Sequence, residues 1–171
     1  MARIEPARTQ ADFSITRELF EEYAARLGVD LCFQGFNTEL TTLDTMYAPP
    51  QGCLLLAWRG DAGVGCVGVR KLSATVCEMK RLYVRDGLRG LGVGRQLAVQ
   101  ILAQARELGY SRMVLDTLEG MSEARGLYAS LGFRECAPYY DNPLAAVVYM
   151  ALDLSPPVSA QLTAAALKER A

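Results

Sequence analysis

A glycine-rich run, Arg89-Gly90-Leu91-Gly92-Val93-Gly94-Arg95, constrains the fold of this chain more than any other segment. It separates a strand-like stretch, residues 77–84, from a stretch with helical periodicity, residues 92–108. Glycines at such a junction let the backbone approach a ligand closely and adopt conformations that other residues avoid. The start of the following helix offers free N–H groups and the positive end of its dipole, which suit an anion. The run therefore predicts a strand–loop–helix unit that holds a phosphate.

Charge and spacing narrow the choice of phosphate ligand. The chain carries 18 Lys and Arg against 19 Asp and Glu, so its formal charge is −1, which argues against nucleic acid as a partner. A P-loop needs Gly-Lys-Ser/Thr at its end, and no Lys-Ser/Thr follows these glycines. The dinucleotide fingerprint Gly-x-Gly-x-x-Gly also fails, because Arg95 and Leu97 stand where its third glycine is needed.

The rest of the chain has the pattern of one domain with a mixed sheet. Apolar patterning predicts strands at residues 2–5, 53–58, 64–72, 77–84, 112–117, 133–136 and 145–152, and helices at 9–27, 38–47, 92–108 and 122–131. Strands in a row, followed by alternating helices and strands, indicate an α/β or α+β fold. The domain is expected to span residues 1–154, and residues 155–171 are expected to be a frayed or marginally helical tail.

The strand at 77–84 is expected to alternate regularly. Period-two alternation places Met79, Arg81 and Tyr83 on one face. The residues assigned to the other face are Glu78, Lys80, Leu82 and Val84. After the glycine run, Ser122 is expected to cap the helix that ends near Gly132.

Several absences limit the chemistry. The chain has no His, so imidazole bases and His-ligated zinc are excluded, and no metal is expected. Its five Cys are odd in number and lack C-x-x-C spacing, which predicts free, mostly buried thiols in a reducing compartment. The N-terminus lacks the apolar core of a signal peptide, and no apolar stretch approaches the ~20 residues of a membrane span. A cytoplasmic protein without membrane contact is the prediction.

Two motifs, in this order and spacing, resemble the GNAT family of N-acetyltransferases. Arg89, Gly92 and Gly94 form Arg-x-x-Gly-x-Gly, similar to the family's acetyl-CoA pyrophosphate loop. Leu127-Tyr128-Ala-Ser-Leu-Gly132-Phe133 is similar to its Leu-Tyr-x-x-x-Gly-Phe signature. The resemblance covers residues 1–154 and implies a mixed, mostly antiparallel central sheet flanked by helices, with a splayed strand pair that holds acetyl-CoA. Met121 replaces an Asn that family members often carry, which puts one polar contact to the cofactor in doubt.

The resemblance implies direct transfer of an acetyl group from acetyl-CoA to a primary amine of a small molecule or an amino-acid-like acceptor. Three alternatives remain open at this point: a protein N-terminus or lysine as acceptor, a longer acyl donor, and a catalytically weak acyl-CoA-binding or regulatory module. Dimers are frequent in the family, so a homodimer is also left open.

Site residues follow from the family positions. Tyr128 is expected to protonate the departing thiolate, because a phenol pKa of ~10 lies near the ~8.5 of a thiol. Glu78 is the candidate base, which calls for a raised pKa; its alternative is an ion pair with Lys80 or Arg81. The residues expected to bind the cofactor, mainly through their backbone, are Leu82, Tyr83, Val84, Arg89, Gly90, Leu91, Gly92, Val93, Gly94 and Arg95.

The acceptor site is expected where the family's early helices and late loop wall a cleft. Its candidate residues are Phe33, Phe36, Tyr139, Tyr140 and Asp141. An acidic Asp141 or Glu39 would attract a cationic amine. The alternative for Phe33 and Phe36 is plain core packing.

Overall fold

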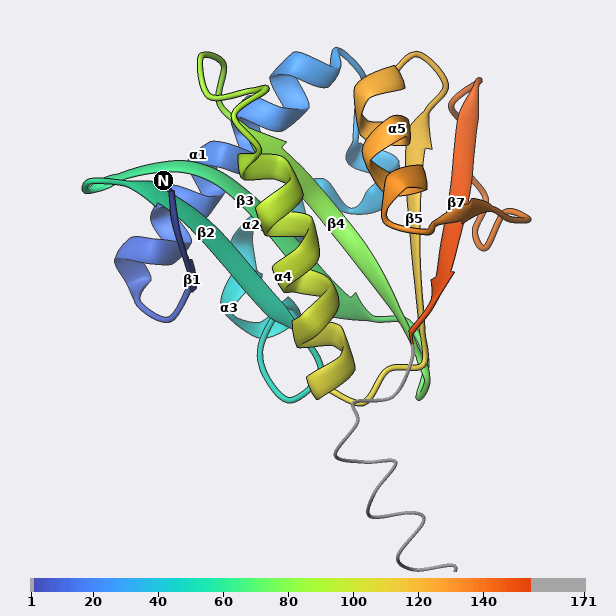
Figure 1. Cartoon of the computed structure of the whole chain (residues 1–171), viewed down its shortest axis with the longest axis horizontal. Coiled ribbons are helices and arrows are strands. Elements are labelled where there is room, and N and C mark those ends of the chain that lie inside the picture. The colour runs from blue at the N-terminus through green and yellow to red at the C-terminus, as the bar shows by residue number, and fades with distance from the viewer. Residues whose placement is uncertain (1, 155–171) are drawn as a thin grey trace, which may run out of the picture.

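Seven strands form one sheet in the order β1-β2-β3-β4-β5-β7-β6 in the computed structural model, which describes residues 2–154 (Figure 1). The strands are β1 (Arg3–Pro6), β2 (Cys53–Arg59), β3 (Ala62–Lys71), β4 (Val76–Val84), β5 (Arg112–Leu118), β6 (Arg134–Glu135) and β7 (Val147–Asp153). All neighbours are antiparallel except the central β4–β5 pair. The predicted mixed, mostly antiparallel sheet is confirmed. The predicted tail, residues 155–171, lies outside the described residues.

The helices begin and end largely where the sequence predicts. They are α1 (Gln10–Leu27), η1 (Cys32–Gln34), α2 (Phe36–Thr41), α3 (Leu43–Met46), α4 (Val93–Glu107) and α5 (Ser122–Ser130). A capping box between Thr9 and Asp12 starts α1, and Gly28 ends it with a left-handed conformation (φ 68°).

Two helix predictions are wrong. The single helix expected at 38–47 is divided, because Thr42 leaves the helical region (φ −127°) and its hydroxyl donates to the Thr38 carbonyl instead. Ser122 is the first residue of α5 rather than its cap; Met121 holds the cap position, and its side chain makes no capping hydrogen bond to the helix.

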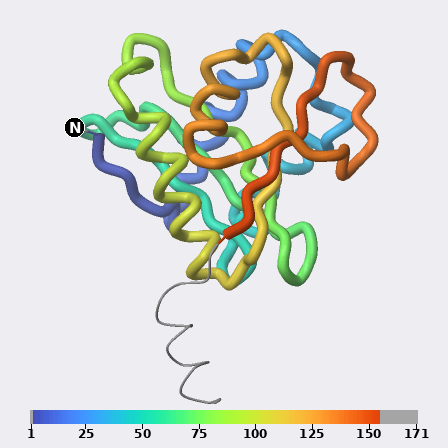
Figure 2. Tube along the Cα trace, turned by 45° about the vertical axis from the view of Figure 1, so that its right-hand side comes forward, coloured from blue at the N-terminus to red at the C-terminus, as the bar shows by residue number. Residues whose placement is uncertain are grey.

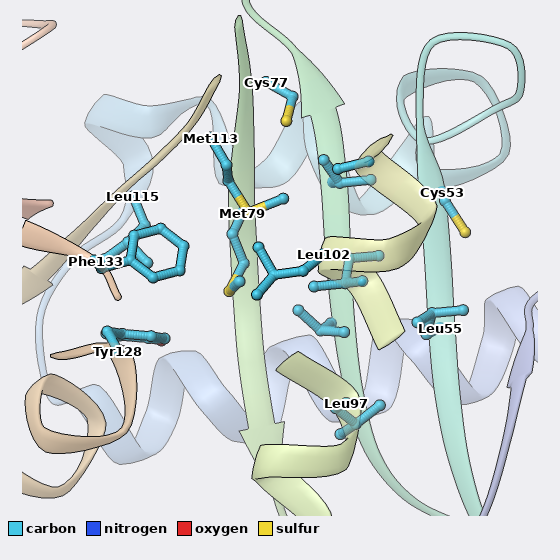
Figure 3. Packing of buried hydrophobic residues seen from close by; sticks show 14 of the residues in the cluster. Cys53, Leu55, Cys77, Met79, Leu97, Leu102, Met113, Leu115, Tyr128 and Phe133 are labelled. Carbon is cyan, nitrogen blue, oxygen red and sulfur yellow. The ribbon is translucent and has the colours of Figure 1, made fainter. Parts of the chain in front are cut away.

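Helices cover both faces of the sheet and create two cores. Leu97, Ile101 and Leu102 of α4 pack on one face of β2–β5, where Figure 3 shows Leu97 and Leu102 lying over the sheet. On the opposite face, Leu19 and Phe20 of α1 form the second core. All five Cys are free, as predicted, although Cys32 is exposed and Cys136 only half-buried. In residues 2–154, none of the helices combines the length and apolarity that a bilayer crossing needs.

A bulge in β4 interrupts its alternation. Cys66 pairs with Tyr83, but Gly68 pairs with Lys80. Two residues of β4, Arg81 and Leu82, therefore lie opposite one residue of β3, Val67. Arg81 adopts a left-handed conformation (φ 57°), which a non-glycine residue rarely takes.

The predicted faces of β4 are therefore wrong beyond Lys80. Cys77, Met79 and Val84 belong to the α4-side core, and Leu82 packs against it. Tyr83 belongs to the α1-side core, and Arg81 contacts Glu39 of α2. The extra residue moves Arg81 to the face of Lys80 and reverses every position after it.

Candidate active site

The central strands β4 and β5 diverge soon after they meet. Their parallel pairing extends over only three residue pairs, from Val76↔Arg112 to Glu78↔Val114. Figure 1 shows the two strands spreading apart, with α5 beside β5. The β5-facing edge of β4 beyond Glu78 is therefore left without a ladder partner. Exposed backbone N–H and C=O groups at such an edge require hydrogen-bond partners, which a ligand can supply.

A large cleft of about 1160 Å³ occupies this opening. It is walled by the end of β4, the glycine-rich loop, the start of α4, α5, the end of β5 and α1. Eight of the ten residues predicted to bind cofactor line it: Leu82, Tyr83, Val84, Arg89, Gly90, Gly92, Gly94 and Arg95. The other two do not: the Leu91 side chain is 65% exposed, and Val93 is buried in the core below α4.

The loop has the geometry of an anion cradle. Gly90 and Gly92 take φ values of 76° and 80°, which favour glycine strongly. Gly92 is the cap residue of α4, and no side chain caps this helix end. The first N–H groups of α4 are thus free to meet a ligand in the cleft. A Cβ on Gly94 would lie 3.7 Å from Val84 Cγ2, so the protein itself has room for one there.

The arginines near this cradle differ in the partners that their side chains already have. Arg26 of α1 lines the cleft, although no sequence motif marks it, and pairs with Asp86; Arg89 lies 3.3 Å from the same carboxylate. Arg95 donates to Ser130 at 2.8 Å. Arg85, by contrast, is held by Glu22 at 2.6 Å and does not line the cleft. Arg26, Arg89 and Arg95 are therefore the arginines that bring positive charge to the wall of the cleft.

Tyr128 lies on α5 between core and cleft. Its ring packs edge-on against Phe133, with 5.8 Å between the ring centroids; both side chains are labelled in Figure 3. The hydroxyl has no hydrogen-bond partner among residues 2–154, yet no fully buried polar side-chain atom there lacks one, so this oxygen reaches the open cleft. Burial, with the nearby charge of Asp116, raises the pKa of Tyr128 well above its usual value. The phenol therefore keeps its proton at neutral pH.

Glu78 is buried, with only 1% of its side chain exposed. Its carboxylate lies 2.7 Å from Arg70 and 3.6 Å from Lys80, and it accepts a hydrogen bond from Tyr139 at 2.8 Å. Burial alone would raise the pKa of Glu78, but the charges of Lys80 and Arg70 outweigh it and leave the pKa below its usual value.

The raised pKa expected of Glu78 as a base is therefore wrong. The alternative left open by the sequence, an ion pair with Lys80, is present. Arg81 pairs with Glu39 instead, at 2.7 Å.

A second, much smaller cavity of about 30 Å³ adjoins the cleft. The two share four lining residues: Tyr23, Leu27, Leu118 and Met121. Its polar lining consists of Gln34, Lys80, Arg81, Asp116 and Thr117. Sequence reasoning missed Asp116 and Gln34. A lone carboxylate within the apolar strand 112–117 was the available signal for Asp116.

The late loop and the early helices meet at this small cavity. Tyr140 donates to Asp116 at 2.8 Å and accepts from Gln34 at 2.8 Å. Figure 2 shows the loop after residue 136 beside the segment that contains η1. Tyr139 and Tyr140 thus belong to the polar network that adjoins the cavity.

The remaining acceptor candidates lie elsewhere. Asp141 is exposed, and Phe33 is 36% exposed. Phe36 packs under the Arg81 guanidinium, 5.1 Å from its ring centroid. Glu39 is buried against Arg81 and Tyr47, so it is occupied rather than open to an amine.

Known proteins share this fold and part of this sequence. Residues 16–133 match the acetyltransferase (GNAT) family profile. An uncharacterised N-acetyltransferase of Schizosaccharomyces pombe is 43% identical over 155 residues, covering 89% of this chain and 94% of that protein. A GNAT acetyltransferase of Staphylococcus aureus superposes with a TM-score of 0.75 at 20% identity, covering 91% of this chain and all of that one.

A second solved structure contains a ligand. The acetyltransferase of Bacillus subtilis in complex with CoA superposes with a TM-score of 0.65 at 22% identity, covering 91% of this chain and 100% of that one. At this identity the likeness shows the fold, while the family profile and the S. pombe relative show descent. The chain belongs to the GNAT family of acetyltransferases, whose fold binds coenzyme A.

Proposed function

We propose that this protein transfers an acetyl group from acetyl-CoA directly to the primary amine of a small-molecule or amino-acid-like acceptor. The observation that carries the proposal is the junction of the two cavities. A large cleft with an anion cradle at one end shares four wall residues with a small cavity that is lined by a carboxylate, Asp116. Donor and acceptor would meet at this junction, which favours a ternary complex over a covalent enzyme intermediate.

Acetyl-CoA, here a substrate, fits the large cleft by its chemistry. The pyrophosphate would accept hydrogen bonds from the loop backbone at Gly90, Gly92 and Gly94 and meet the positive end of α4. Leu91 and Val93 do not line the cleft, so for these two residues only backbone contacts with the cofactor remain predicted. The edge of β4 at Leu82–Val84 has no ladder partner on the β5 side and would hold the pantetheine arm and the thioester carbonyl, although the Val84 carbonyl already accepts a hydrogen bond from Arg89 Nε at 3.0 Å.

The chemical step needs a proton for the leaving sulfur. The amine nitrogen attacks the thioester carbon, the C–S bond breaks, and the Tyr128 hydroxyl donates its proton to the sulfur as the thiolate forms. A raised pKa keeps that proton available but makes the phenol a weaker acid. Proton transfer from Tyr128 must therefore accompany C–S cleavage, as the negative charge develops on the sulfur.

For the amine side, Asp116 is better placed than Glu78. Glu78 is held by two cations and does not line the small cavity, whereas Asp116 lines it and pairs with no cation among residues 2–154. We assign to Asp116 the acceptance of a hydrogen bond from the amine and of its proton, directly or through water. The proton that Asp116 accepts from the amine then returns to the Tyr128 phenolate, which completes the catalytic cycle.

Calorimetry with acetyl-CoA and free CoA tests the cofactor site. Gly94→Leu would place a bulky side chain in the cleft, and we expect binding to be lost while the fold is kept. Gly126→Leu is the matched control, because Gly126 is also a helical glycine but does not line the cleft. Equal binding by both variants would contradict the assignment.

Turnover of a primary-amine panel, followed as CoA release, tests the reaction. We expect Tyr128→Phe to bind acetyl-CoA normally but to lower kcat by roughly 100-fold or more, the usual contribution of a positioned acid. Acetyl-CoA binding without turnover of any amine would favour the acyl-CoA-binding module instead. A cytoplasmic location, the absence of a metal and a homodimer stay predictions.

A further inference from the structure

The wall between the large cleft and the small cavity contains one side chain that can pass on a proton. Four residues line both spaces. Three of them, Leu27, Leu118 and Met121, have no O–H or N–H group on their side chains. The fourth is Tyr23 of α1. Among residues 2–154, its phenol is therefore the only side-chain proton donor that borders both spaces.

The ring of Tyr23 is fixed by packing, whereas its hydroxyl is not used by the fold. The ring lies edge-on to Tyr83, with 6.3 Å between centroids, and 5.7 Å from the Arg81 guanidinium carbon. The nitrogens of Arg81 donate to Glu39 and Gln34. Within the described part of the chain, the Tyr23 hydroxyl forms no hydrogen bond of normal geometry, and no fully buried polar side-chain atom lacks one. The Tyr23 oxygen therefore reaches the open space beside it.

Tyr23 also stands between the two groups that exchange a proton in the proposed reaction. Asp116 lines the small cavity but not the cleft, whereas Tyr128 lines the cleft but not the small cavity. Burial raises the pKa of Tyr23; the Arg81 charge opposes this, and the Asp116 charge adds to it. Burial first, and then a negative charge on Tyr23, raise the pKa of Tyr128, so the two phenols lie within electrostatic reach of each other. Both hydroxyls keep their protons at neutral pH.

We propose that the Tyr23 hydroxyl relays the proton from Asp116 to Tyr128. This inference rests on the proposed function and specifies its proton path. As Tyr128 gives its proton to the sulfur, the Tyr23 proton moves to the Tyr128 oxygen, and the Tyr23 oxygen takes the proton that Asp116 received from the amine. One proton leaves the nitrogen and one arrives at the sulfur, while all three side chains end as they began.

Water can carry a proton across the remaining gaps of this path. The small cavity, at about 30 Å³, has room for about two water molecules. Its polar lining, which includes Asp116, Gln34 and Thr117, supplies the hydrogen-bond partners that such waters need. Donor and acceptor then occupy the large cleft, and the small cavity serves the proton alone.

The relay explains how a phenol with a raised pKa can act as the acid. Alone, Tyr128 would become a poorly solvated anion when it protonates the sulfur, which its environment disfavours. A proton that arrives from Tyr23 in the same step prevents that charge from accumulating. Loss of the Tyr23 hydroxyl should therefore slow the transfer and leave the binding of acetyl-CoA unchanged.

Tyr23→Phe keeps the ring and removes only the hydroxyl. We expect calorimetry to show unchanged acetyl-CoA binding, and kcat with the best amine of the panel to fall by roughly 10- to 100-fold. Tyr149→Phe is the matched control. Its ring packs on Tyr140, a hydrogen-bond partner of Asp116, but it lines neither space, and its hydroxyl already donates to the Tyr140 carbonyl at 3.3 Å. This control should keep the kcat of wild type.

A double variant separates a relay from a packing role. If Tyr23 acts through Tyr128, Tyr23→Phe/Tyr128→Phe should have the kcat of Tyr128→Phe alone, whereas independent roles would multiply the two losses. A plot of kcat against the deuterium fraction of the solvent should be curved for wild type, because several protons move together, and nearer to linear for Tyr23→Phe. Amine turnover that Tyr23→Phe leaves unchanged, or losses that multiply, would overturn the relay while the proposed function stands. No turnover of any amine by wild type would overturn both.

Discussion

The buried ion pair between Arg81 and Glu39 gives the sharpest test of how this site is held together. The two side chains are 3% and 2% exposed, and two nitrogens of the guanidinium donate to the carboxylate. The Tyr47 hydroxyl donates to the same carboxylate. The Arg81 guanidinium also lies near the rings of Tyr23 and Phe36, at 5.7 and 5.1 Å from their centroids.

Arg81→Met would leave the Glu39 carboxylate buried with one neutral donor. Stranding one member of a buried pair costs about 3–5 kcal/mol of unfolding free energy. Against a total stability of roughly 5–15 kcal/mol, that loss is large. The double variant Glu39→Gln/Arg81→Met removes the stranded charge, while the new amide oxygen still accepts from Tyr47. We expect it to be more stable than Arg81→Met alone by about 2 kcal/mol, so the second substitution rescues the first.

Urea unfolding measures both effects, with the fluorescence of the single tryptophan, Trp58, as the probe. Trp58 packs against the α1-side core, so it reports on the same face of the sheet. With a denaturant slope of about 2 kcal/mol per molar, Arg81→Met should lower the midpoint by roughly 1.5–2.5 M. A loss below about 1 kcal/mol, or a double variant less stable than Arg81→Met, would refute the view that charge burial dominates here.

Two further predictions concern stability. The pKa of Glu78 is lower in the folded than in the unfolded state. Its contribution to the free energy of unfolding is therefore complete above the ordinary value of 4.5 and is lost as the pH falls through the folded pKa. Glu78→Gln should make the free energy of unfolding depend less on pH in the acid range, and an unchanged dependence would contradict the lowered pKa. At Gly68, an added Cβ would meet the Tyr47 ring at 2.5 Å, so Gly68→Ala should cost about 1–3 kcal/mol in urea unfolding. Gly126→Ala is its control, because nothing lies within 4 Å of that Cβ and stability should hold or rise; equal effects of the two would exclude the steric explanation.

The features that the sequence predicts correctly are those determined by a few adjacent residues. The turn at Gly28, the glycine loop and the start of α4 depend on backbone conformations that a few adjacent residues determine. The Leu127–Phe133 motif likewise places Tyr128 on the cleft wall within one short helix. The cleft that is expected to hold the donor could therefore be outlined from the sequence.

The acceptor side of the site could not be predicted from the sequence, because its contacts join distant parts of the chain. Gln34 and Asp116 are 82 residues apart, and Gln34 and Tyr140 are 106 apart. Glu39 was expected to attract an amine, but its pairing with Arg81 spans 42 residues and depends on the bulge in β4. The periodicity of the strand does not indicate that extra residue. The faces of all later side chains in β4 depend on it, so they could not be predicted either.

The same bulge shapes both halves of the site. In a regular strand Lys80 and Arg81 would point to opposite faces, and one of them would enter the α4-side core. The extra residue places both on the α1 face, where η1 supplies Gln34 and α2 supplies Glu39. It also returns Leu82 and Val84 to the α4 face, just beyond Glu78, the last residue of β4 that pairs with β5. One irregularity of the backbone thus accompanies both the open edge at the end of β4 and the charges of the small cavity, and a change that regularised β4 would be expected to disturb both.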